Sequence, residues 1–443
     1  MTIASTDTVI IGAGPYGLSI SAHLSRSGVP HQILGKPMHA WRDFMPPGML
    51  LRSEPFASSL YAPWRGYTME AYCRRHRIAY KAVGIRMPLE LFVDYGLWFQ
   101  SQVVDHARPV EVVDMHRADG GFQLALAGGG SLVARRAVIA LGLKGFAQRP
   151  LALQGLPRPY VVHSSEIGNL AWAEGKDIVV VGGGQSAIGL AALFSELGAR
   201  VRLLVRDEVN WSGEQRSVRR GVTRLLRGRV GLGRGWNSNS PGSLLMSFLL
   251  SEYPVVFHMM DASRRKKIME TGWAASGAWW LRSRVEGKVD ISTQTEITHA
   301  ELKNEQIVLQ VATGSKPSSI RADHVVLATG FKTDMAKHAF LSEELRDALS
   351  LDGGSPGLTR NFETNVPGLY VVGPAAAPSF GPALRFIYGA KYAAPHLAGH
   401  IGRCFRKEAG NHIIKPQAAP VEPVEAKSGS VLHGQGILQA PEN

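Results

Sequence analysis

Two apolar, strand-like runs lie far apart in the chain, and each leads into a glycine-rich turn and then a helical pattern. The first run is residues 8–11, followed by helical spacing over 18–27. The second is 177–181, followed by helical spacing over 188–197. The order of strand, glycine turn and helix is typical of a dinucleotide-binding fold. The pattern therefore predicts two such units.

The segments after each turn also repeat. Alternating apolar and polar residues predict a short β-meander in each half. The expected meander strands are 110–113, 122–126, 289–292 and 306–311. Each meander ends in a buried-type strand with a glycine exit, at 137–142 and 324–330. We therefore expect an α/β chain with two Rossmann-like dinucleotide-binding domains.

The repeat sets the expected domain boundaries. Residues 1–150 form the first part of one domain, 151–325 form the second domain, and 326–405 return to the first. A helical insertion at about 207–280 interrupts the second domain. The tail, 411–443, lacks periodicity and is rich in proline and small residues, so we expect disorder there.

Each glycine of the first turn has its own steric reason. Gly12 permits a tight turn, Gly14 lets a pyrophosphate approach the backbone, and Gly17 lets helix and strand pack closely. The unpaired N–H groups at the helix start then face the phosphates. The candidate cofactor residues of this turn are Gly12, Gly14, Pro15, Tyr16 and Gly17.

The second turn supplies the candidates Gly182, Gly184, Gln185 and Ser186. We expect the last two to contact nicotinamide or pyrophosphate. Arg206 follows the next strand, where an NADP-type site places an arginine for the 2′-phosphate; a plain surface arginine is the alternative. On this basis NADPH is expected in preference to NADH.

The corresponding strand of the first half departs from the rule. It ends in Leu34, Gly35 and Lys36, where an acidic ribose ligand would be expected. Ribose contacts are therefore expected from Lys36 or from the backbone.

Composition narrows the function classes. The 443 residues, 45% of them hydrophobic, provide enough apolar material for two cores. The two cysteines, Cys73 and Cys404, exclude a CxxC redox pair, a disulfide framework and a cysteine-rich zinc site. The net charge of +13 indicates attraction to anions, although its densest run also fits a solvated face. That run comprises Arg216, Arg219, Arg220, Arg224, Arg227, Arg229 and Arg234.

We expect no nucleic-acid partner, no transmembrane segment and no metal cluster. No nucleic-acid-binding motif accompanies the charge. The longest apolar region, 244–260, is interrupted by polar residues and proline, so no transmembrane segment is expected. No metal cluster is needed for the chemistry below. The N-terminus carries no targeting pattern, and we expect a cytoplasmic protein.

Together these features resemble the class B flavoprotein monooxygenases, which include flavin-containing monooxygenases, Baeyer–Villiger monooxygenases and the ornithine and lysine N-hydroxylases. The similarity extends to about His400, and His163 stands at the family's linker histidine. Besides the two turns, it is carried by Trp41, Arg42, Pro47, Gly48, Met49, Ala328, Thr329 and Gly330. It implies a glutathione-reductase-like FAD domain with an inserted NADPH domain.

The resemblance places FAD in the first domain and NADPH in the second. It adds the cofactor candidates Lys36, Trp41, Arg42, Thr329, Gly330 and Gly373. Residues 366–373 are similar to the returning FAD strand, and a helix is expected to open at 380–383 and to run through Leu397. Pro374 replaces the acidic residue that related disulfide-reductase-type flavoproteins place after the glycine.

The resemblance also implies the chemistry. In the family, NADPH reduces FAD, O₂ adds at flavin C4a, and the hydroperoxide or its anion transfers one oxygen atom. Arg52 could stabilise a peroxide anion, and Ser53 could bond near flavin N5. A structural salt bridge between Arg52 and Glu54 explains these residues equally well. His163 is expected to orient chain segments rather than to transfer protons.

The insertion is expected to cap the flavin. Its Trp273, Trp279 and Trp280 could line a pocket, although core packing is the favoured role.

The leading hypothesis is an NADPH- and O₂-dependent monooxygenase of a small organic substrate, with N-hydroxylation ahead of Baeyer–Villiger or sulfur oxygenation. The first alternative is an NADPH-dependent flavoprotein reductase that passes electrons to another acceptor. The second is a redox-sensing or structural protein that keeps a flavin without turnover. The oligomeric state is left open, with a homo-oligomer among the options.

Overall fold

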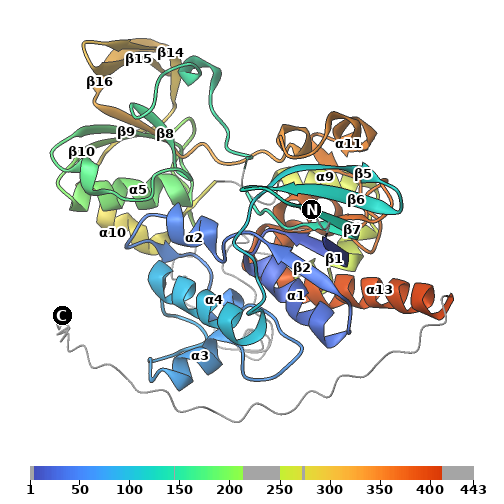
Figure 1. Cartoon of the computed structure of the whole chain (residues 1–443). Helices are drawn as coiled ribbons and strands as arrows, with labels where there is room; N and C mark the ends of the chain where they lie inside the picture. Colours follow the sequence, from blue (N-terminus) through green and yellow to red (C-terminus); the bar gives the residue numbers. More distant parts are fainter. Residues whose placement is uncertain (1–3, 144, 213–249, 272–274, 412–443) are drawn as a thin grey trace. The chain divides into compact units, whose positions relative to one another are not determined.

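The computed structural model describes residues 4–143, 145–212, 250–271 and 275–411 (Figure 1). The chain divides into two units, residues 1–405 and 406–443, and the fold below is that of the first. The expectations for the arginine run, for Trp273 and for the tail lie outside the described residues. No helix in the described part of the chain is long and apolar enough to cross a membrane.

The first sheet combines strands from both ends of this unit. Its order is β2–β1–β7–β6–β5, and β20 also pairs with β7. Val138 of β7 lies between Ile10 of β1 and Tyr370 of β20 in register. Strands β1, β2 and β20 are parallel to their neighbours, whereas β5 and β6 are antiparallel. The bounds are β1 (Ala4–Ile11), β2 (His31–Leu34), β5 (Val112–Ala118), β6 (Gly121–Leu126), β7 (Ser131–Ile139) and β20 (Leu369–Val371).

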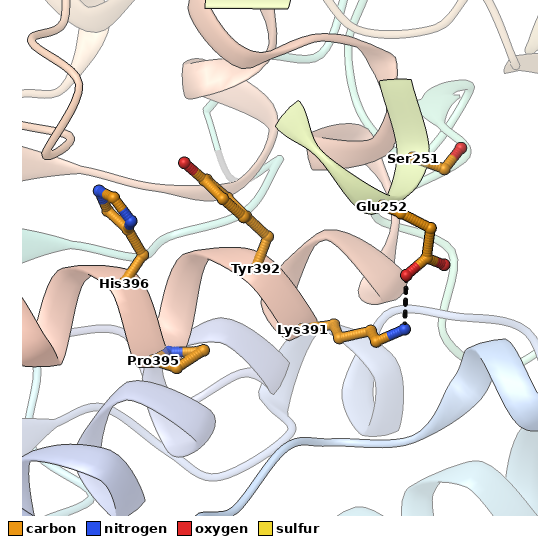
Figure 2. A pocket seen from close by; sticks show the side chains of 6 residues that line it. All are labelled: Ser251, Glu252, Lys391, Tyr392, Pro395 and His396. Carbon is orange, nitrogen blue, oxygen red and sulfur yellow. Dashed lines mark hydrogen bonds and ion pairs between the residues drawn. The ribbon is translucent and has the colours of Figure 1, made fainter. Parts of the chain in front are cut away.

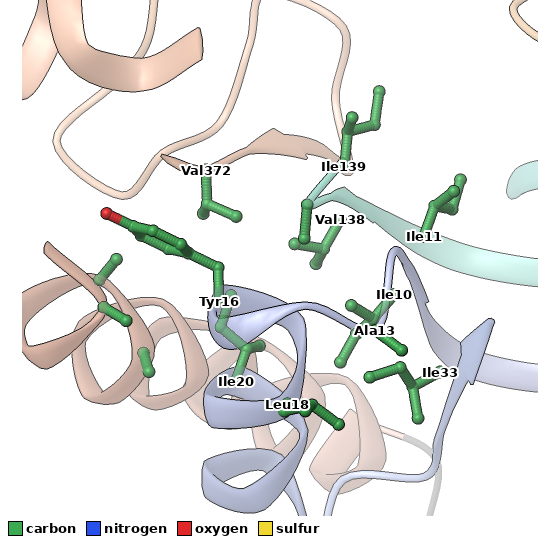
Figure 3. Close-up of a cluster of buried hydrophobic side chains, with 14 of the residues drawn as sticks. Ile10, Ile11, Ala13, Tyr16, Leu18, Ile20, Ile33, Val138, Ile139 and Val372 are labelled. Carbon is green, nitrogen blue, oxygen red and sulfur yellow. The ribbon is translucent and has the colours of Figure 1, made fainter. Parts of the chain in front are cut away.

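The core of the first domain forms where helix α1 (Pro15–Arg26) packs on this sheet (Figure 3). Ile10 and Val138 come from the central strands, and Leu18 and Ile20 come from the helix; all four are fully buried. Burying aliphatic side chains of this size stabilises the fold by about 1.5–3 kcal/mol each. This packing fixes the start of α1 against the end of β1, which is where the first glycine turn lies.

The second sheet is entirely parallel, with the order β13–β10–β9–β17–β8. Helix α5 (Gln185–Glu196) packs on it through buried residues such as Ile188 and Phe194. A separate antiparallel sheet of β14–β15–β16 follows in the chain before β17. The bounds are β8 (Val161–His163), β9 (Asp177–Val181), β10 (Arg200–Leu204), β13 (Asp290–Ser292), β14 (Thr295–Lys303), β15 (Gln306–Thr313), β16 (Lys316–Ala322) and β17 (His324–Leu327).

The prediction for the second meander was wrong in one strand. Residues 289–292 were expected to pair with 306–311, but β13 joins the parallel sheet beside β10, and β15 pairs with β14 and β16. The Arg202 guanidinium bonds the Asp290 carboxylate at 2.6 Å across the β10–β13 pair. Two apolar residues in a short run predict a strand but not its partner.

The returning segment also departs from expectation. Residues Pro382–Arg385 and Ile387–Gly389 form short 3₁₀ helices, and the long helix α13 (Ala390–Asn411) begins only afterwards. Gly381, with φ +92°, lies outside helical backbone, and Phe386 is extended. These two residues interrupt the helix that the sequence placed at 380–397.

Two helices in the described part of the insertion pack on the first domain. Helices α8 (Pro254–His258) and α9 (Ala262–Thr271) contact α12 (Ala377–Phe380) of the returning segment. Buried Phe257 lies against Gly381, where a Cβ would come within 3.0 Å of its ring. The remaining elements are α2 (His39–Asp43), β3 (Leu50–Leu51), α3 (Met69–Arg75), β4 (Met87–Pro88), α4 (Leu89–Val103), β11 (Trp211–Ser212), β12 (Gly277–Ala278), α10 (Arg282–Val285), α11 (Glu343–Ala348), β18 (Leu351–Asp352) and β19 (Ser355–Pro356).

Candidate functional site

The first glycine turn has the steric form that its sequence predicts. Gly12 has φ +112°, and a Cβ on it would lie 2.5 Å from the Ala140 carbonyl oxygen. A Cβ on Gly17 would lie 1.9 Å from the Gly12 carbonyl oxygen, so the helix and the turn that follows β1 are in backbone contact. Gly14 is the N-cap of α1, with nothing within 4 Å of its Cβ position. The free N–H groups of the helix start therefore have room for a phosphate.

Tyr16 has a protein contact that the sequence did not indicate. Its hydroxyl lies 2.9 Å from the carbonyl oxygen of Leu384 and 2.8 Å from that of Phe386. A Cβ on Gly389 would lie 2.2 Å from this hydroxyl, and one on Gly373 would lie 3.6 Å from the ring. Burial raises the pKa of Tyr16 well above its usual value. Tyr16 thus ties α1 to the returning segment, while Pro15 is the first residue of the helix.

The other first-domain candidates follow β2. Lys36 is exposed. Trp41 packs edge-to-face on Phe92, with ring centroids 4.8 Å apart. Arg42 donates to both carboxylate oxygens of Asp43, at 2.7 and 3.0 Å. This hydrogen bond is the main cause of a lowered pKa for Asp43. Trp41 and Arg42 therefore already have protein partners, whereas Lys36 has its ammonium group in solvent.

The second turn repeats the first with one change. Gly182 has φ +136°, and a Cβ there would lie 2.4 Å from the Ala328 carbonyl oxygen. Gly184 is the N-cap of α5. Buried Ala187 stands where the first turn has Gly17. The Gln185 side-chain oxygen accepts the Ala278 N–H at 2.8 Å, and Ser186 is exposed.

Arg206 lies just beyond the end of β10. This strand pairs with β9, which leads into the second turn. Its side chain is 75% exposed, and its Nε lies 3.7 Å from the Asp207 carboxylate. An exposed ion pair at this distance contributes little to stability. The guanidinium is therefore available to a phosphate.

His163 links the second domain to the glycine exit at Gly330. Its Nε2 lies 3.1 Å from the Gly330 carbonyl oxygen, which can only accept, so Nε2 carries the proton. Nδ1 then accepts from the Ser165 hydroxyl at 2.8 Å. Burial lowers the pKa of His163, which keeps the ring neutral. Beside it, the Thr329 hydroxyl donates to the Gln148 carbonyl at 2.6 Å. His163 is a positioning residue in this geometry.

Arg52 and Glu54 do not pair with each other. The Arg52 guanidinium lies 3.3 Å from the Ser276 carbonyl oxygen and 3.2 Å from its hydroxyl. Glu54 accepts the Gly84 N–H at 2.7 Å, and the Ser53 hydroxyl lies 2.8 Å from that of Ser58. Although Arg52 reaches solvent, the surrounding protein lowers the pKa of its guanidinium. The salt-bridge alternative for Arg52 is therefore wrong.

Residues Ser276 to Ala278 connect the two groups of candidates and were not singled out from the sequence. Ser276 contacts Arg52, and Ala278 contacts Gln185. A Cβ on Gly277 would lie 2.4 Å from the Ile188 side chain of α5, so this glycine lets the segment approach the second turn. Three consecutive small residues before a tryptophan pair are the signal that could have identified it.

The tryptophan pair packs at the edge of the second core. The Arg86 guanidinium lies 5.8 Å from the Trp279 ring centroid and 5.6 Å from that of Trp280. Trp280 is partly buried against the second core. Trp280 therefore packs against the core, which is the role favoured from the sequence. The contact with the Arg86 guanidinium was not predicted.

A pocket of about 370 Å³ opens where the insertion meets α13 (Figure 2). The Glu252 carboxylate accepts from the Tyr388 hydroxyl and, at 2.7 Å, from the Lys391 ammonium. Burial, followed by the bond to Glu252, raises the pKa of Tyr388. The lining residues are Ser251, Glu252, Lys391, Tyr392, Pro395 and His396. No sequence pattern indicated this pocket, because its two walls are more than 130 residues apart in the chain.

A second cleft, of about 390 Å³, lies beside Thr329. It is lined by three cationic side chains, Arg149, Lys332 and Lys337, and Arg149 also bonds Glu166. The excess of positive charge suits an anionic ligand.

One mixed and one parallel sheet, each with a glycine turn between a parallel strand and a helix N-terminus, define an oxidoreductase fold with two dinucleotide sites. The model of the pyridine nucleotide-disulphide oxidoreductase family matches residues 6–233, and the chain belongs to this family. The expected fold class is thereby confirmed, as is an oxidoreductase whose cofactors are FAD and a nicotinamide dinucleotide.

Solved structures support the fold at low sequence identity. The reduced form of ornithine hydroxylase from Pseudomonas aeruginosa is 17% identical, covers 91% of this chain and 100% of its own, and superposes with a TM-score of 0.71. The expected resemblance to class B monooxygenases is confirmed at the level of the fold.

Relatives by sequence match shorter regions. FAD-dependent urate hydroxylase from Xanthomonas campestris is 28% identical over 219 residues, 45% of each chain. Ferredoxin–NADP reductase from Leptothrix cholodnii is 32% identical over 115 residues, which are 26% of this chain and 31% of the reductase. The chain therefore spans less than half the length of these relatives.

Proposed function

We propose that the chain is an FAD-containing monooxygenase that uses NADPH and O₂ to insert one oxygen atom into a small organic substrate. N-hydroxylation is favoured over Baeyer–Villiger and sulfur oxygenation. One observation carries the proposal: the chain has two dinucleotide-binding turns but no pair of cysteines that could form a redox-active disulfide. Cys73 is buried in the first core and Cys404 lies on α13, and both are free. Electrons from NADPH must therefore leave the flavin for an acceptor other than a protein disulfide.

The residues of the first turn fit FAD. The Gly12 and Gly17 contacts leave no room for a side chain, and the open N-cap at Gly14 suits a pyrophosphate. Lys36 would neutralise negative charge near the ribose end. Arg385, between the two carbonyls that bond Tyr16, makes no hydrogen bond or ion pair with any described residue, and burial lowers its pKa. We assign it a cofactor contact as well.

The residues of the second turn fit NADPH. The N-terminus of α5 would hold the pyrophosphate, with Gln185 and Ser186 beside it. Arg206 would bind the 2′-phosphate, which NADH lacks. When bound, FAD supplies hydride acceptance and oxygen activation.

Arg52 and Ser53 would act where oxygen chemistry takes place. A guanidinium held by Ser276 is preorganised, and it would stabilise negative charge that develops on oxygen. The Ser53 hydroxyl would offer a hydrogen bond nearby. The fold of the ornithine hydroxylase and the packing of α8 and α9 on the returning segment support a covered site of this kind.

The test is anaerobic reduction of the purified holoprotein by NADPH and by NADH, followed by mixing with O₂ while flavin absorbance is recorded. We expect faster reduction by NADPH and a delayed return of the oxidised flavin spectrum. Substrate should then yield an oxygenated product in proportion to the NADPH consumed. Failure of both nucleotides to reduce the flavin would contradict any NAD(P)H-dependent activity.

A second function, an NADPH-dependent flavoprotein reductase, is favoured by the match to ferredoxin–NADP reductase. It requires the same two nucleotide sites. Immediate reoxidation by O₂, with faster turnover on ferricyanide or ferredoxin and no oxygenated product, would select it over the monooxygenase.

A further inference from the structure

Three polar groups from separate elements of the first domain meet at one point, away from both glycine turns. They are the Ser21 hydroxyl on α1, Nε2 of His31 on β2, and Nε2 of His106 after α4. The hydroxyl oxygen lies 2.8 Å from the first Nε2 and 3.3 Å from the second, and the two Nε2 atoms are 3.3 Å apart. The rings meet edge to face.

The opposite side of each ring determines where its proton lies. Nδ1 of His31 is 2.9 Å from the Val29 carbonyl oxygen, which can only accept, so the proton of the neutral ring is on Nδ1. Nδ1 of His106 faces the Asp105 carboxylate at 3.6 Å, which favours the same tautomer. Both Nε2 lone pairs then face the same point. The Ser21 hydroxyl has one proton and is closer to His31, so one lone pair is left without a donor.

Two features of this arrangement match those of transition-metal sites. Histidines that bind metals usually donate their other ring N–H to a carbonyl or carboxylate. Nδ1 of His31 does so to Val29, and Nδ1 of His106 faces the Asp105 carboxylate at 3.6 Å. Zinc–nitrogen bonds of about 2.0–2.1 Å at a tetrahedral angle place two ring nitrogens about 3.3 Å apart. The two Nε2 atoms have this separation.

We propose that His31 and His106 bind a divalent transition-metal ion of the zinc class through their Nε2 atoms, with water completing its coordination. Among the described residues there is no group of three or more His, Cys, Asp and Glu side chains that could hold a metal. The two imidazoles would therefore be the only charged or nitrogen ligands that these residues give the ion. The ion would clamp α1, β2 and the segment after α4 together. It has no part in the proposed oxygen chemistry.

A further observation agrees with this proposal. The His106 side chain is 39% exposed, which gives the ion a path from solvent, whereas Ser21 is fully buried. The Asp105 carboxylate faces Nδ1 of His106, and the Arg108 guanidinium is bonded to Gln32, the residue after His31, at 2.9 Å.

The test uses the FAD-loaded chain without an affinity tag, first treated with a chelator. Zinc sulfate is titrated in competition with a chromogenic zinc chelator for the wild type, His106→Ala, Asp105→Asn and a matched control, His116→Ala. His116 is also partly exposed and lies 2.8 Å from an aspartate, Asp114. We expect one zinc equivalent in the wild type and the control. Zinc affinity should fall about tenfold in Asp105→Asn and further in His106→Ala.

Thermal unfolding provides a second readout. Zinc should raise the unfolding midpoint of the wild type and of His116→Ala, but not that of His106→Ala. Unchanged FAD content and an unchanged midpoint in chelator show that His106→Ala is folded. Equal zinc affinity of the wild type and His106→Ala, or no zinc uptake by the wild type, would overturn the proposal and leave a hydrogen bond between the two rings.

Discussion

The two glycine turns share their tight bend but differ in what surrounds them. Gly12 and Gly182 each come within 2.5 Å of a carbonyl oxygen at their Cβ positions. The first turn is then closed by distant segments, through the Tyr16 hydroxyl and the pairing of β20 with β7. The second is bordered by one nearby segment, Ser276 to Ala278, and by exposed Arg206. The difference is that expected between a cofactor that stays bound and one that exchanges in each cycle.

The third position of each turn gives the largest expected effect. Gly17→Ala would place a methyl group 1.9 Å from the Gly12 carbonyl oxygen, so the backbone must separate. We expect destabilisation of about 3 kcal/mol or more and loss of FAD from the purified protein. The matched change, Ala187→Gly, should cost about 1 kcal/mol and leave FAD content unchanged. Urea unfolding and flavin absorbance measure both. Normal FAD content in Gly17→Ala would show that the first turn is not the FAD site.

Arg52 lies on the connection between the turns, and Arg52→Gln tests its proposed role. The variant should lower the rate of oxygenated-product formation about 100-fold, because a preorganised donor to a developing oxyanion is lost. Anaerobic flavin reduction by NADPH should stay within about twofold of the wild type if Arg52 acts only on oxygen. Equal losses in both steps would instead assign Arg52 to packing against Ser276.

Arg206→Gln tests whether the second turn is the NADPH site. Loss of one charge-assisted hydrogen bond to the 2′-phosphate, about 1.5–3 kcal/mol, should raise KM for NADPH about 10- to 100-fold. KM for NADH should not change. Steady-state kinetics with both nucleotides gives the ratio directly, and a parallel rise for both would refute the 2′-phosphate assignment.

Tyr16→Phe tests the closure of the first turn. It leaves the Leu384 and Phe386 carbonyl oxygens without their shared donor, at a cost of about 1–3 kcal/mol. FAD should dissociate faster on dilution, while KM for NADPH stays constant. The dissociation rate can be followed by the rise of free-flavin fluorescence.

The smallest effect concerns pH. Burial lowers the pKa of His163 in the folded chain, so the unfolded chain takes up the proton first as the pH falls through the ordinary value of about 6.5. Stability should therefore decrease toward acid. His163→Gln, whose amide N–H can still reach Gly330, should show a shallower decrease in urea midpoint between about pH 7.5 and 5.5. An identical slope would mean that other histidines with a lowered pKa, such as the half-buried His258 and His396, dominate.

Local patterns predicted local structure well. The strand at 177–181 has the bounds of β9, and the three glycines of the first turn have the steric contacts that their spacing indicates. Residue identity did not indicate contacts with partners far away in the chain. Tyr16 stays a predicted cofactor contact, and its hydroxyl bonds carbonyl groups more than 360 residues away. The role of Ser276 depends on Arg52, 224 residues distant, and no short-range pattern encodes such a meeting.

The pairing of β20 with β7 has a consequence for synthesis. Residues 137–139 of β7 have an unpaired edge until residues 369–371 have been synthesised, and the whole second domain is synthesised in between. On the ribosome the second domain can therefore complete its parallel sheet first, while the nascent first sheet keeps an open edge. A chain released before residue 369 would expose that edge to other chains, so premature termination should yield aggregates rather than a free half-domain.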